Sequence, residues 1–552
     1  MIEVSGIRVP LSRLDSDERH ELDAVRTATL RKLHLTAGDI VSFELRRRSI
    51  DARKKAAIML NYTARLMLRG HANAERQLFA RLERKHAARG VKHVDEQLFQ
   101  LPRAHGLAPD ERPVVVGAGC AGLFCALALA EAGLAPLLVE RGDDATRRTS
   151  AIEQLNDTGT LDPESNIQFG LGGAGTFSDG KLATGTKSPA HRFILETFVE
   201  AGAARNILWD AKPHVGSDVL PRVVENIVGR IRAAGGEVRC HTRMVGLGIS
   251  GGRVRSVSLE SRDPQTGLLR EETVRTSHVV LACGHSARDV FELLRDLGVT
   301  LERKTFAMGV RIEHLQADVD RAQYGPSAGH PALGAAPYGL SCHLNDGRGA
   351  FSFCMCPGGY VVAAASEPGG VITNGMSLSD RAGTNANSGL LANVFPTDLP
   401  GDDVLAGVEL QRSCERAAYQ MGGGAFVAPA QLVGDFLQGV ASSGPGRVMP
   451  TYPRGVAWGT VDGCLPSYVS SSLRAGIPLL ERQLRGFSVA DAVLTGVESR
   501  SSSRVRVPRD ENGQALGIAG LFPCGEGAGY AGGIMSAATD GIRAASWLLA
   551  TL

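Results

Sequence analysis

Hydrophobic and polar positions alternate differently in the first hundred residues and in the rest of the chain. The first part predicts strands at residues 2–10 and 39–45 and helices at residues 16–35 and 75–89. Ser16 is a candidate N-cap for the first of these helices. Periodicity leaves residues 56–68 undecided between strand and helix. We therefore expect a small α+β unit over residues 1–100.

A linker rich in Pro, Gly and Ala at residues 101–110 precedes a βαβ pattern over residues 113–142. Beyond it, the pattern predicts helices at 193–201 and 217–234 and strands at 237–249, 253–259, 273–282, 307–312, 351–353 and 359–365. Residues 520–552 are expected to form a strand, a glycine-rich turn and a helix. Alternation of strands and helices in this order is typical of an α/β protein.

The βαβ pattern carries the spacing GxGxxG, with Gly117, Gly119 and Gly122 directly after a run of three valines. In such motifs the first glycine makes a tight turn, the second lets the backbone approach a diphosphate, and the third lets the helix pack closely on the strand. Cys120 and Ala121 stand at the helix start, where backbone amides and about half a positive charge favour phosphate. The spacing predicts a dinucleotide site.

The second strand of this unit ends at Glu140, followed by Arg141. A carboxylate at that point can bind the ribose hydroxyls of adenosine and disfavours the 2′-phosphate of NADP.

Two later segments favour FAD over NAD. A buried strand ends at Gly284, and another ends at Gly525 and Glu526, before Gly532, Gly533 and Ile534 open the last helix. An acid there can bind the ribityl chain, and a helix N-terminus stabilises negative charge on reduced flavin. We expect FAD as the cofactor and consider NAD(P)H only as a transient electron donor or acceptor.

Composition places the chain among globular proteins: 43% of its 552 residues are hydrophobic, 21% are charged, and the net charge is +2. Residues 1–100 hold 20 Lys and Arg against 13 Asp and Glu. No secretion signal, membrane-spanning stretch or zinc-type cysteine spacing is evident, and the ten scattered cysteines suit reduced thiols, so we expect a cytoplasmic protein without a metal site and without a membrane partner. The basic stretch lacks the interleaved aromatic residues of single-strand nucleic-acid binders.

Long composite motifs resemble a family of bacterial FAD-dependent proteins known as NAD(FAD)-utilising dehydrogenases. The motifs are SIDARKK (49–55), NIQFG (166–170), GGAGTFSDGKL (172–182), KPHVG (212–216), GHSARD (284–289), GVRIEH (309–314), FCMCPGG (353–359), NGMS (374–377), GVESR (496–500) and CGEGAGYAGGIMS (524–536). One departure is Leu171, where this resemblance leads us to expect Glu.

The resemblance implies an α/β fold with a discontinuous FAD-binding Rossmann domain of the glutathione-reductase type. That domain would comprise residues 101–300 and 495–552, with an inserted α+β substrate domain at 301–494 and a small ferredoxin-like α+β domain at 1–100.

Four residues are candidates for catalysis. His285 follows the Gly284 turn, His314 at a strand end is a candidate general base, and Tyr530 lies in the C-terminal run expected to face the flavin. Arg311 shares one strand face with Glu313, which allows an ion pair between them. A structural role is the alternative for each histidine, including His214.

The glycine-rich loop at 170–181 is expected to contact the diphosphate or the isoalloxazine through Gly173, Gly175, Thr176 and Lys181, with a plain tight turn as the alternative. Cys354 and Cys356 suggest either a redox dithiol or two packing thiols, and the second reading is favoured because thiols on one strand face rarely close a disulfide. Arg381, Arg474 and Arg500 are candidate carboxylate anchors, and Tyr360 is a further candidate acid.

The function predicted is that of an FAD-dependent dehydrogenase that transfers hydride between a small-molecule substrate and flavin N5. Two alternatives stay open: an FAD-dependent monooxygenase, and a flavoprotein that acts on RNA through the basic N-terminal domain. The sequence does not indicate an oligomeric state.

Overall fold

The computed structural model describes residues 1–15, 17–84, 88–95, 99–101, 103–104 and 111–552. The chain folds into two compact units. The first comprises residues 1–99, 204–214 and 317–336, and the second comprises residues 100–203, 215–316 and 337–552. Within the described ranges no helix has both the length and the apolar character that crossing a bilayer requires. Most of the predicted linker at 101–110 falls outside these ranges.

The first unit is a four-stranded antiparallel sheet with two helices. Its elements are β1 (Ile2–Pro10), α1 (Glu18–Leu33), β2 (Ile40–Asp51), β3 (Met59–Leu68), α2 (His71–Arg84) and β4 (Val91–His93), and the strand order is β2-β3-β1-β4. This is the β-α-β-β-α-β order of ferredoxin-like units. Alternate residues of β3 are buried, which decides the ambiguous segment as a strand. Asp17 caps α1 by accepting from the Arg19 amide, whereas Ser16 lies outside the described residues.

The rest of the first unit comes from later parts of the chain. It includes the short helices η4 (Arg205–Leu208) and η5 (Gly325–Ser327) and nearly all of α8 (Gln316–Tyr324). In this unit Arg48 donates to Glu21 at 2.6 Å and to the carbonyl oxygen of Ala332 at 2.7 Å.

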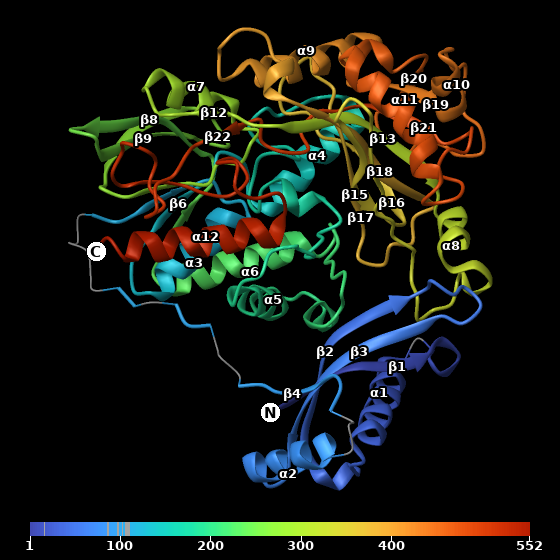
Figure 1. Cartoon of the computed structure of the whole chain (residues 1–552). Coiled ribbons are helices and arrows are strands. Elements are labelled where there is room, and N and C mark those ends of the chain that lie inside the picture. Colours follow the sequence, from blue (N-terminus) through green and yellow to red (C-terminus); the bar gives the residue numbers. More distant parts are fainter. Residues whose placement is uncertain (16, 85–87, 96–98, 102, 105–110) are drawn as a thin grey trace. The chain divides into compact units, whose positions relative to one another are not determined.

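The second unit is built on a five-stranded parallel sheet. Its strands, in the order β23-β11-β5-β6-β7, are β23 (Leu521–Pro523), β11 (Val279–Leu281), β5 (Val114–Val116), β6 (Leu137–Val139) and β7 (Glu237–Arg239). On one face lie α3 (Cys120–Glu131), α12 (Ile534–Leu549), α6 (Leu220–Ala233) and α5 (Ala190–Glu200), which pack against one another (Figure 1). Close packing depends on Gly541, where a Cβ atom would lie 2.0 Å from the Ala121 carbonyl oxygen.

A three-stranded antiparallel sheet covers the opposite face. It comprises β8 (Thr242–Ser250), β9 (Arg253–Arg262) and β10 (Leu269–Arg275), next to α7 (Arg288–Asp296). Alternate side chains of β5, β6 and β11 share one hydrophobic core with Met244, Leu247 and Val257 of this layer. Burial between two layers explains why these short parallel strands are continuously apolar.

The single strands predicted over 237–249 and 273–282 are wrong, because each is two strands that belong to different sheets. The first breaks at His241, whose φ of 53° is incompatible with a continuous strand. The second breaks where the Thr276 hydroxyl donates to the carbonyl oxygens of Arg112 and His278. The two halves of each run then pair with strands that are far apart from each other in the sequence.

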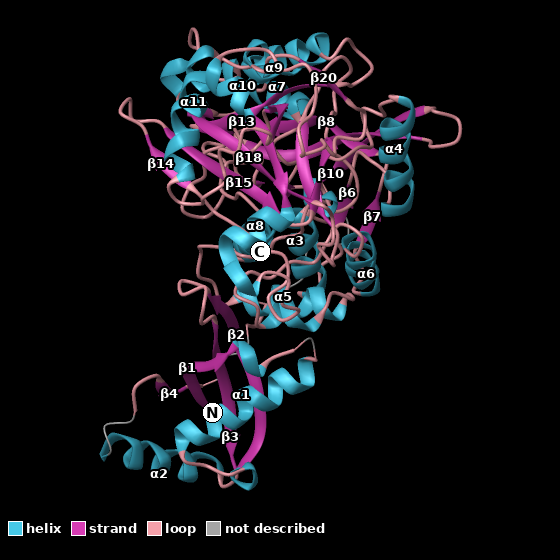
Figure 2. Cartoon of the chain, turned by 90° about the vertical axis from the view of Figure 1, so that its right-hand side faces the viewer, coloured by secondary structure: helices cyan, strands magenta, loops and turns pink. Residues whose placement is uncertain are grey.

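A seven-stranded sheet forms the remaining layer of the second unit. Its order is β14 (Ser341–His343), β15 (Gly349–Cys356), β18 (Asn385–Val394), β13 (Phe306–Leu315), β21 (Val493–Glu498), β19 (Ala428–Leu432) and β20 (Val456–Trp458). The helices α9 (Ala406–Met421), α10 (Val433–Gln438) and α11 (Ser467–Glu481) gather on one side of it (Figure 2). Smaller elements are α4 (Ala145–Thr158), the pair β16 (Gly359–Ala363) and β17 (Thr373–Ser377), and the pair β12 (Glu302–Arg303) and β22 (Val505–Arg506).

Candidate functional site

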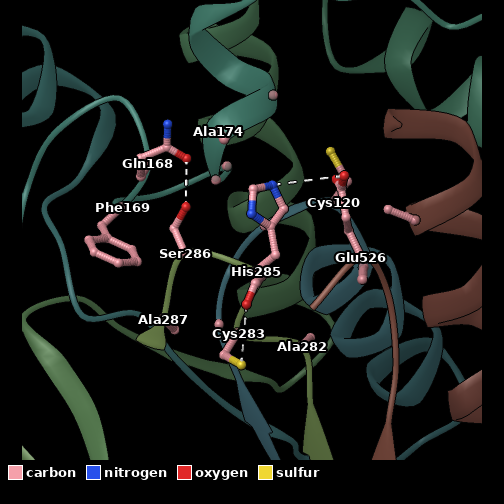
Figure 3. A pocket seen from close by; sticks show the side chains of 18 of the residues that line it. Cys120, Gln168, Phe169, Ala174, Ala282, Cys283, His285, Ser286, Ala287 and Glu526 are labelled. Atoms are coloured by element: carbon pink, nitrogen blue, oxygen red, sulfur yellow. Dashed lines mark hydrogen bonds and ion pairs between the residues drawn. The ribbon is translucent and has the colours of Figure 1, made fainter. Parts of the chain in front are cut away.

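A cavity of about 370 Å³ lies within the second unit. Its walls come from segments far apart in the sequence: the loop after β5, the end of β6, residues 168–183, the end of β11, β15 and the start of α12. The carboxyl ends of parallel strands are the usual place for a nucleotide in such sheets. Figure 3 shows the part of the cavity around His285 and Glu526.

The glycine loop at residues 117–122 has the backbone that its spacing predicts. Gly117 has a φ of 98°, and a Cβ atom there would lie 2.5 Å from the Ala282 carbonyl oxygen. A Cβ atom at Gly122 would lie 1.8 Å from the Gly117 carbonyl oxygen. Both positions therefore exclude side chains, so that β5, β11 and α3 can approach closely.

Two helices begin at the cavity without a side-chain cap. Gly119 precedes α3, Gly533 precedes α12, and neither helix start carries a capping hydrogen bond from a side chain. A Cβ atom at Gly119 would meet nothing nearer than 3.8 Å, and at Gly532 or Gly533 nothing within 4 Å. The walls are therefore lined at these points by backbone amides with room for an anionic ligand.

Glu140 lines the cavity at the end of β6 and is only 5% exposed. Its carboxylate accepts from the amides of Ala118 at 2.9 Å, Gly170 at 2.9 Å and Gly142 at 3.1 Å. An ionised carboxylate has about four lone-pair positions, so one is left for a hydroxyl donor. Glu140 thus ties the glycine loop to residues 170–175 and can still bind a ribose.

Arg148 of α4 shapes the loop before Gly173 and was not predicted from the sequence. Its fully buried guanidinium donates to the carbonyl oxygens of Asn166, Ile167 and Leu171 at 2.9 Å each, and to that of Gly170 at 3.3 Å. Burial lowers the pKa of Arg148 to about 10. Nothing in the local pattern separates Arg148 from a surface arginine, because all its partners are carbonyl groups 18 to 23 residues away.

Replacement of Arg148 with methionine is expected to lower the free energy of unfolding by about 3 kcal/mol, because the carbonyl groups of Asn166 and Ile167 lose their donor and those of Gly170 and Leu171 lose one of two. FAD content should fall with it, since this loop lines the cavity. Urea unfolding and the flavin absorbance of the purified protein measure both. The neighbouring Arg147→Met variant is the control, because the Arg147 side chain is half exposed and its pair with Asp144 spans 3.9 Å. Equal behaviour of the two variants would contradict this role of Arg148.

His285 and Glu526 lie together in the cavity wall, with 3.8 Å between His285 Nε2 and Glu526 Oε1 (Figure 3). Burial, followed by the charge of Arg504, lowers the pKa of His285 to about 3, so its imidazole is neutral. Burial raises the pKa of Glu526 to about 7. An acid that titrates near neutral pH is better matched to proton transfer than an imidazole with so low a pKa. Glu526, expected from the sequence to bind the cofactor, therefore also becomes the candidate acid–base group.

Three of the four predicted catalytic residues lie outside the cavity lining. His314 is buried and donates through Nε2 to the Phe487 carbonyl oxygen at 2.8 Å, and Tyr530 accepts from the Arg509 amide beneath that arginine's side chain. The ion pair that this spacing allows between Arg311 and Glu313 does not form. Arg311 pairs instead with Glu498 of β21 at 3.0 Å, because the strand register brings that carboxylate beside it, whereas Glu313 accepts from Thr451 and Asn385.

Most of the predicted cofactor-binding residues line the cavity. They are Gly117, Gly119, Cys120, Ala121, Glu140, Arg141, Gly173, Gly175, Lys181, Gly284, Glu526, Gly532, Gly533 and Ile534. Gly122, Thr176 and Gly525 do not line it, and a Cβ atom at Gly525 would lie 2.8 Å from that of Ala121. Arg141 pairs with Glu164 and Asp289, and Lys181 pairs with Asp179.

The three arginines predicted as carboxylate anchors form ion pairs within the protein. Arg381 pairs with Asp179, Arg474 with Asp462 and Arg500 with Glu415, and of these arginines only Arg500 lines the cavity. Leu171 is buried and faces a second cavity of about 550 Å³, next to α4 and α6, rather than the first.

Comparison with known proteins gives three matches to family models. Residues 305–501 match "FAD-dependent protein, C-terminal domain-like", residues 112–154 match "FAD binding domain", and residues 1–67 match a domain of unknown function. A protein of Clostridium beijerinckii, described as uncharacterized, is 39% identical over 545 residues, which cover 99% of this chain and 98% of that protein.

Similar solved structures have low sequence identity and low TM-scores. A flavin-dependent brominase triple mutant is 14% identical, with a TM-score of 0.37 and coverage of 80% of this chain and 81% of the other. A 3-ketosteroid dehydrogenase from Rhodococcus jostii RHA1 is 14% identical, with a TM-score of 0.35 and coverage of 82% and 100%. The glycerol-3-phosphate dehydrogenase from Bacillus halodurans is 14% identical, with a TM-score of 0.33 and coverage of 80% and 65%.

Proposed function

The chain belongs to a family of FAD-dependent proteins with FAD as cofactor, and from this premise we propose that it is a dehydrogenase acting on a small molecule. One observation carries the proposal: a single cavity unites the glycine loop, Glu140, two uncapped helix starts and the pair His285–Glu526. We also propose that the domain organisation is of the glutathione-reductase type. Its FAD domain would comprise residues 101–300 and 495–552, with a substrate domain at 301–494 and an N-terminal domain at 1–100.

The cavity residues fit FAD. Open space beside Gly119, Gly532 and Gly533 leaves room for the diphosphate and the isoalloxazine, and the helix starts supply amide donors for negative charge. Glu140 retains acceptor capacity for the adenosine ribose. When bound, the flavin supplies the hydride acceptor that no protein side chain can provide.

The protein's own contribution is to move the proton that accompanies hydride loss from the substrate. Glu526 takes this proton in its ionised form, because its pKa near 7 leaves it half ionised at neutral pH. His285 stays neutral beside it, with its Nε2 atom 3.8 Å from the carboxyl group. Arg500, which also lines the cavity, is held by Glu415 and presents positive charge to an anionic substrate group.

Anaerobic reduction tests the proposed activity. The purified protein should carry about one FAD per chain, and its flavin spectrum should bleach without dioxygen when a suitable reduced substrate is added. Turnover that needs both dioxygen and NAD(P)H and yields a hydroxylated product would point to the monooxygenase alternative instead.

Replacement of Glu526 with glutamine is expected to lower turnover by about 10²-fold, within the usual contribution of a general base. In the wild type the rate should rise as the pH passes through about 7, because the ionised carboxylate is the active form. The variant should lose this limb of the pH profile. Glu511→Gln, at an exposed turn of the same C-terminal region, is the matched control. A variant that kept the wild-type pH profile would rule out Glu526 as the base.

A further inference from the structure

Cys354 and Cys356 lie beside the cavity at the end of β15. Cys354 is half-buried and lines the cavity, whereas Cys356 is fully buried behind it. The Cys356 thiol donates to the Cys354 carbonyl oxygen, with 3.2 Å between Sγ and oxygen. All ten cysteines lie within the described ranges, and none of them is paired in a disulfide.

The backbone between these cysteines departs from a regular strand. Phe353 pairs with Gly389 and Cys356 pairs with Asn387, so that two residues of β15 stand opposite one residue of β18. Cys354 has a φ of 43°, in the left-handed region that residues with a side chain rarely adopt. The objection that thiols on a flat strand face rarely close a disulfide therefore does not apply. Strained backbone of this kind is concentrated at functional sites.

Two cationic side chains from different parts of the chain lie beside the cysteine pair. Lys181 Nζ lies 3.9 Å from Cys356 Sγ, and Arg311 Nη2 lies 3.7 Å from the same sulfur. Arg311 Nη2 also donates to the Cys354 carbonyl oxygen at 3.0 Å. Positive charge at this distance stabilises a thiolate.

Three cationic side chains share two carboxylates in this part of the described structure. Asp179 is shared by Lys181 and Arg381, and Arg311 pairs with Glu498. A thiolate on the cysteine pair would add negative charge beside these cations.

The two thiols have opposite pKa shifts. The neighbouring Cys356 thiol, together with Lys181 and Arg311, holds the pKa of Cys354 below its ordinary value, against burial and the charge of Asp179. The neighbouring Cys354 and burial hold the pKa of Cys356 well above its ordinary value. The pair therefore carries one charge and one proton near neutral pH, the state from which thiol–disulfide chemistry starts.

Cys354 lines the same cavity as Glu526. Its charge contributes to the raised pKa of Glu526. Glu526 precedes α12, whose start is the part of the cavity expected to face the isoalloxazine.

We propose that Cys354 and Cys356 form a redox-active dithiol that exchanges electrons with the flavin in the same cavity. Oxidation forms the bond between the two Sγ atoms and breaks the S–H bond of Cys356. The thiolate–thiol pair gives up two electrons and one proton, which is the number that oxidised flavin takes up on reduction to its anion, so no further reactant is needed. The exchange goes beyond the proposed dehydrogenase activity and rests on FAD occupying the cavity.

Thiol chemistry of the apoprotein tests the pair without any flavin. Iodoacetamide at pH about 6 is expected to alkylate Cys354 at least ~10-fold faster than Cys342, because only a thiolate reacts and burial raises the pKa of Cys342. Mild oxidation with diamide should remove about 2 Da from the peptide that contains residues 354 and 356, through a new disulfide. Slow alkylation of Cys354 together with an unchanged peptide mass would overturn the proposal.

Electron counting in the holoprotein tests the exchange with the flavin. After diamide treatment, anaerobic dithionite titration should consume about four electron equivalents per FAD in the wild type and in Cys342→Ser, but about two in Cys354→Ser and Cys356→Ser. Equal uptake of about two in all four proteins would overturn the proposal even if FAD is bound. Absence of FAD from every protein would instead contradict the assigned cofactor, while the apoprotein results would still decide the dithiol.

Discussion

Replacement of Gly119 with valine is expected to abolish FAD binding while the apoprotein stays folded. Gly119 has φ −73° and ψ −178°, a conformation open to any residue, and a Cβ atom there would meet no protein atom nearer than 3.8 Å. The added side chain would instead occupy the space through which the backbone meets the diphosphate. Loss of two charge-assisted amide–phosphate bonds at about 1.5–3 kcal/mol each predicts affinity weaker by ~10²–10⁴-fold.

Two other glycine variants separate this effect from a folding defect. Gly229 lies on an exposed face of α6, and a Cβ atom there would meet nothing within 4 Å. The FAD affinity and the stability of Gly229→Val should therefore stay close to wild type. Gly122→Ala should unfold the unit, because its Cβ atom would lie 1.8 Å from a backbone oxygen. Isothermal titration of each apoprotein with FAD, together with circular dichroism, measures both quantities. Tight FAD binding by Gly119→Val would show that the diphosphate lies elsewhere.

The sequence predicts the dinucleotide unit well because its determinants are local. The apolar strand, the glycine spacing and Glu140 lie within one βαβ segment, and they meet in the structure as expected. Strand breaks at His241 and Thr276 were missed, because these runs look continuous in polarity and only long-range pairing divides them between sheets.

The burial and the partners of charged side chains are what the sequence predicts least well. The spacing allows Arg311 to pair with Glu313, two residues away, but its partner Glu498 is 187 residues away. Arg148 looks like its neighbour Arg147, although one is buried and the other half exposed. The polarity of an arginine predicts a surface position, and only its tertiary partners reverse that preference.

Glu415 of α9 is the clearest case of such a buried charge. Its carboxylate accepts two hydrogen bonds from Arg288, at 2.8 and 3.0 Å, and two from Arg500, at 3.0 and 2.9 Å. These three side chains are at most 2% exposed. Burial alone would raise the pKa of Glu415, but Arg500 and Arg288 outweigh burial and hold this pKa at about 2.

Replacement of Glu415 with glutamine should therefore lower the free energy of unfolding by about 3–5 kcal/mol, because the buried Arg500 loses its counter-charge and Arg288 keeps only its pair with Glu367. A folded-state pKa below the ordinary value of 4.5 gives stability that is present above pH 4.5 and is lost as the pH falls towards 2. The wild type and the variant should accordingly differ most near pH 7 and converge in acid. Urea unfolding from pH 7 to pH 3 measures this, with Glu409→Gln on the exposed side of the same helix as the control. A constant difference across this range would show that Glu415 stabilises the fold by packing rather than by charge, and Arg500 would then owe its position in the cavity wall to other contacts.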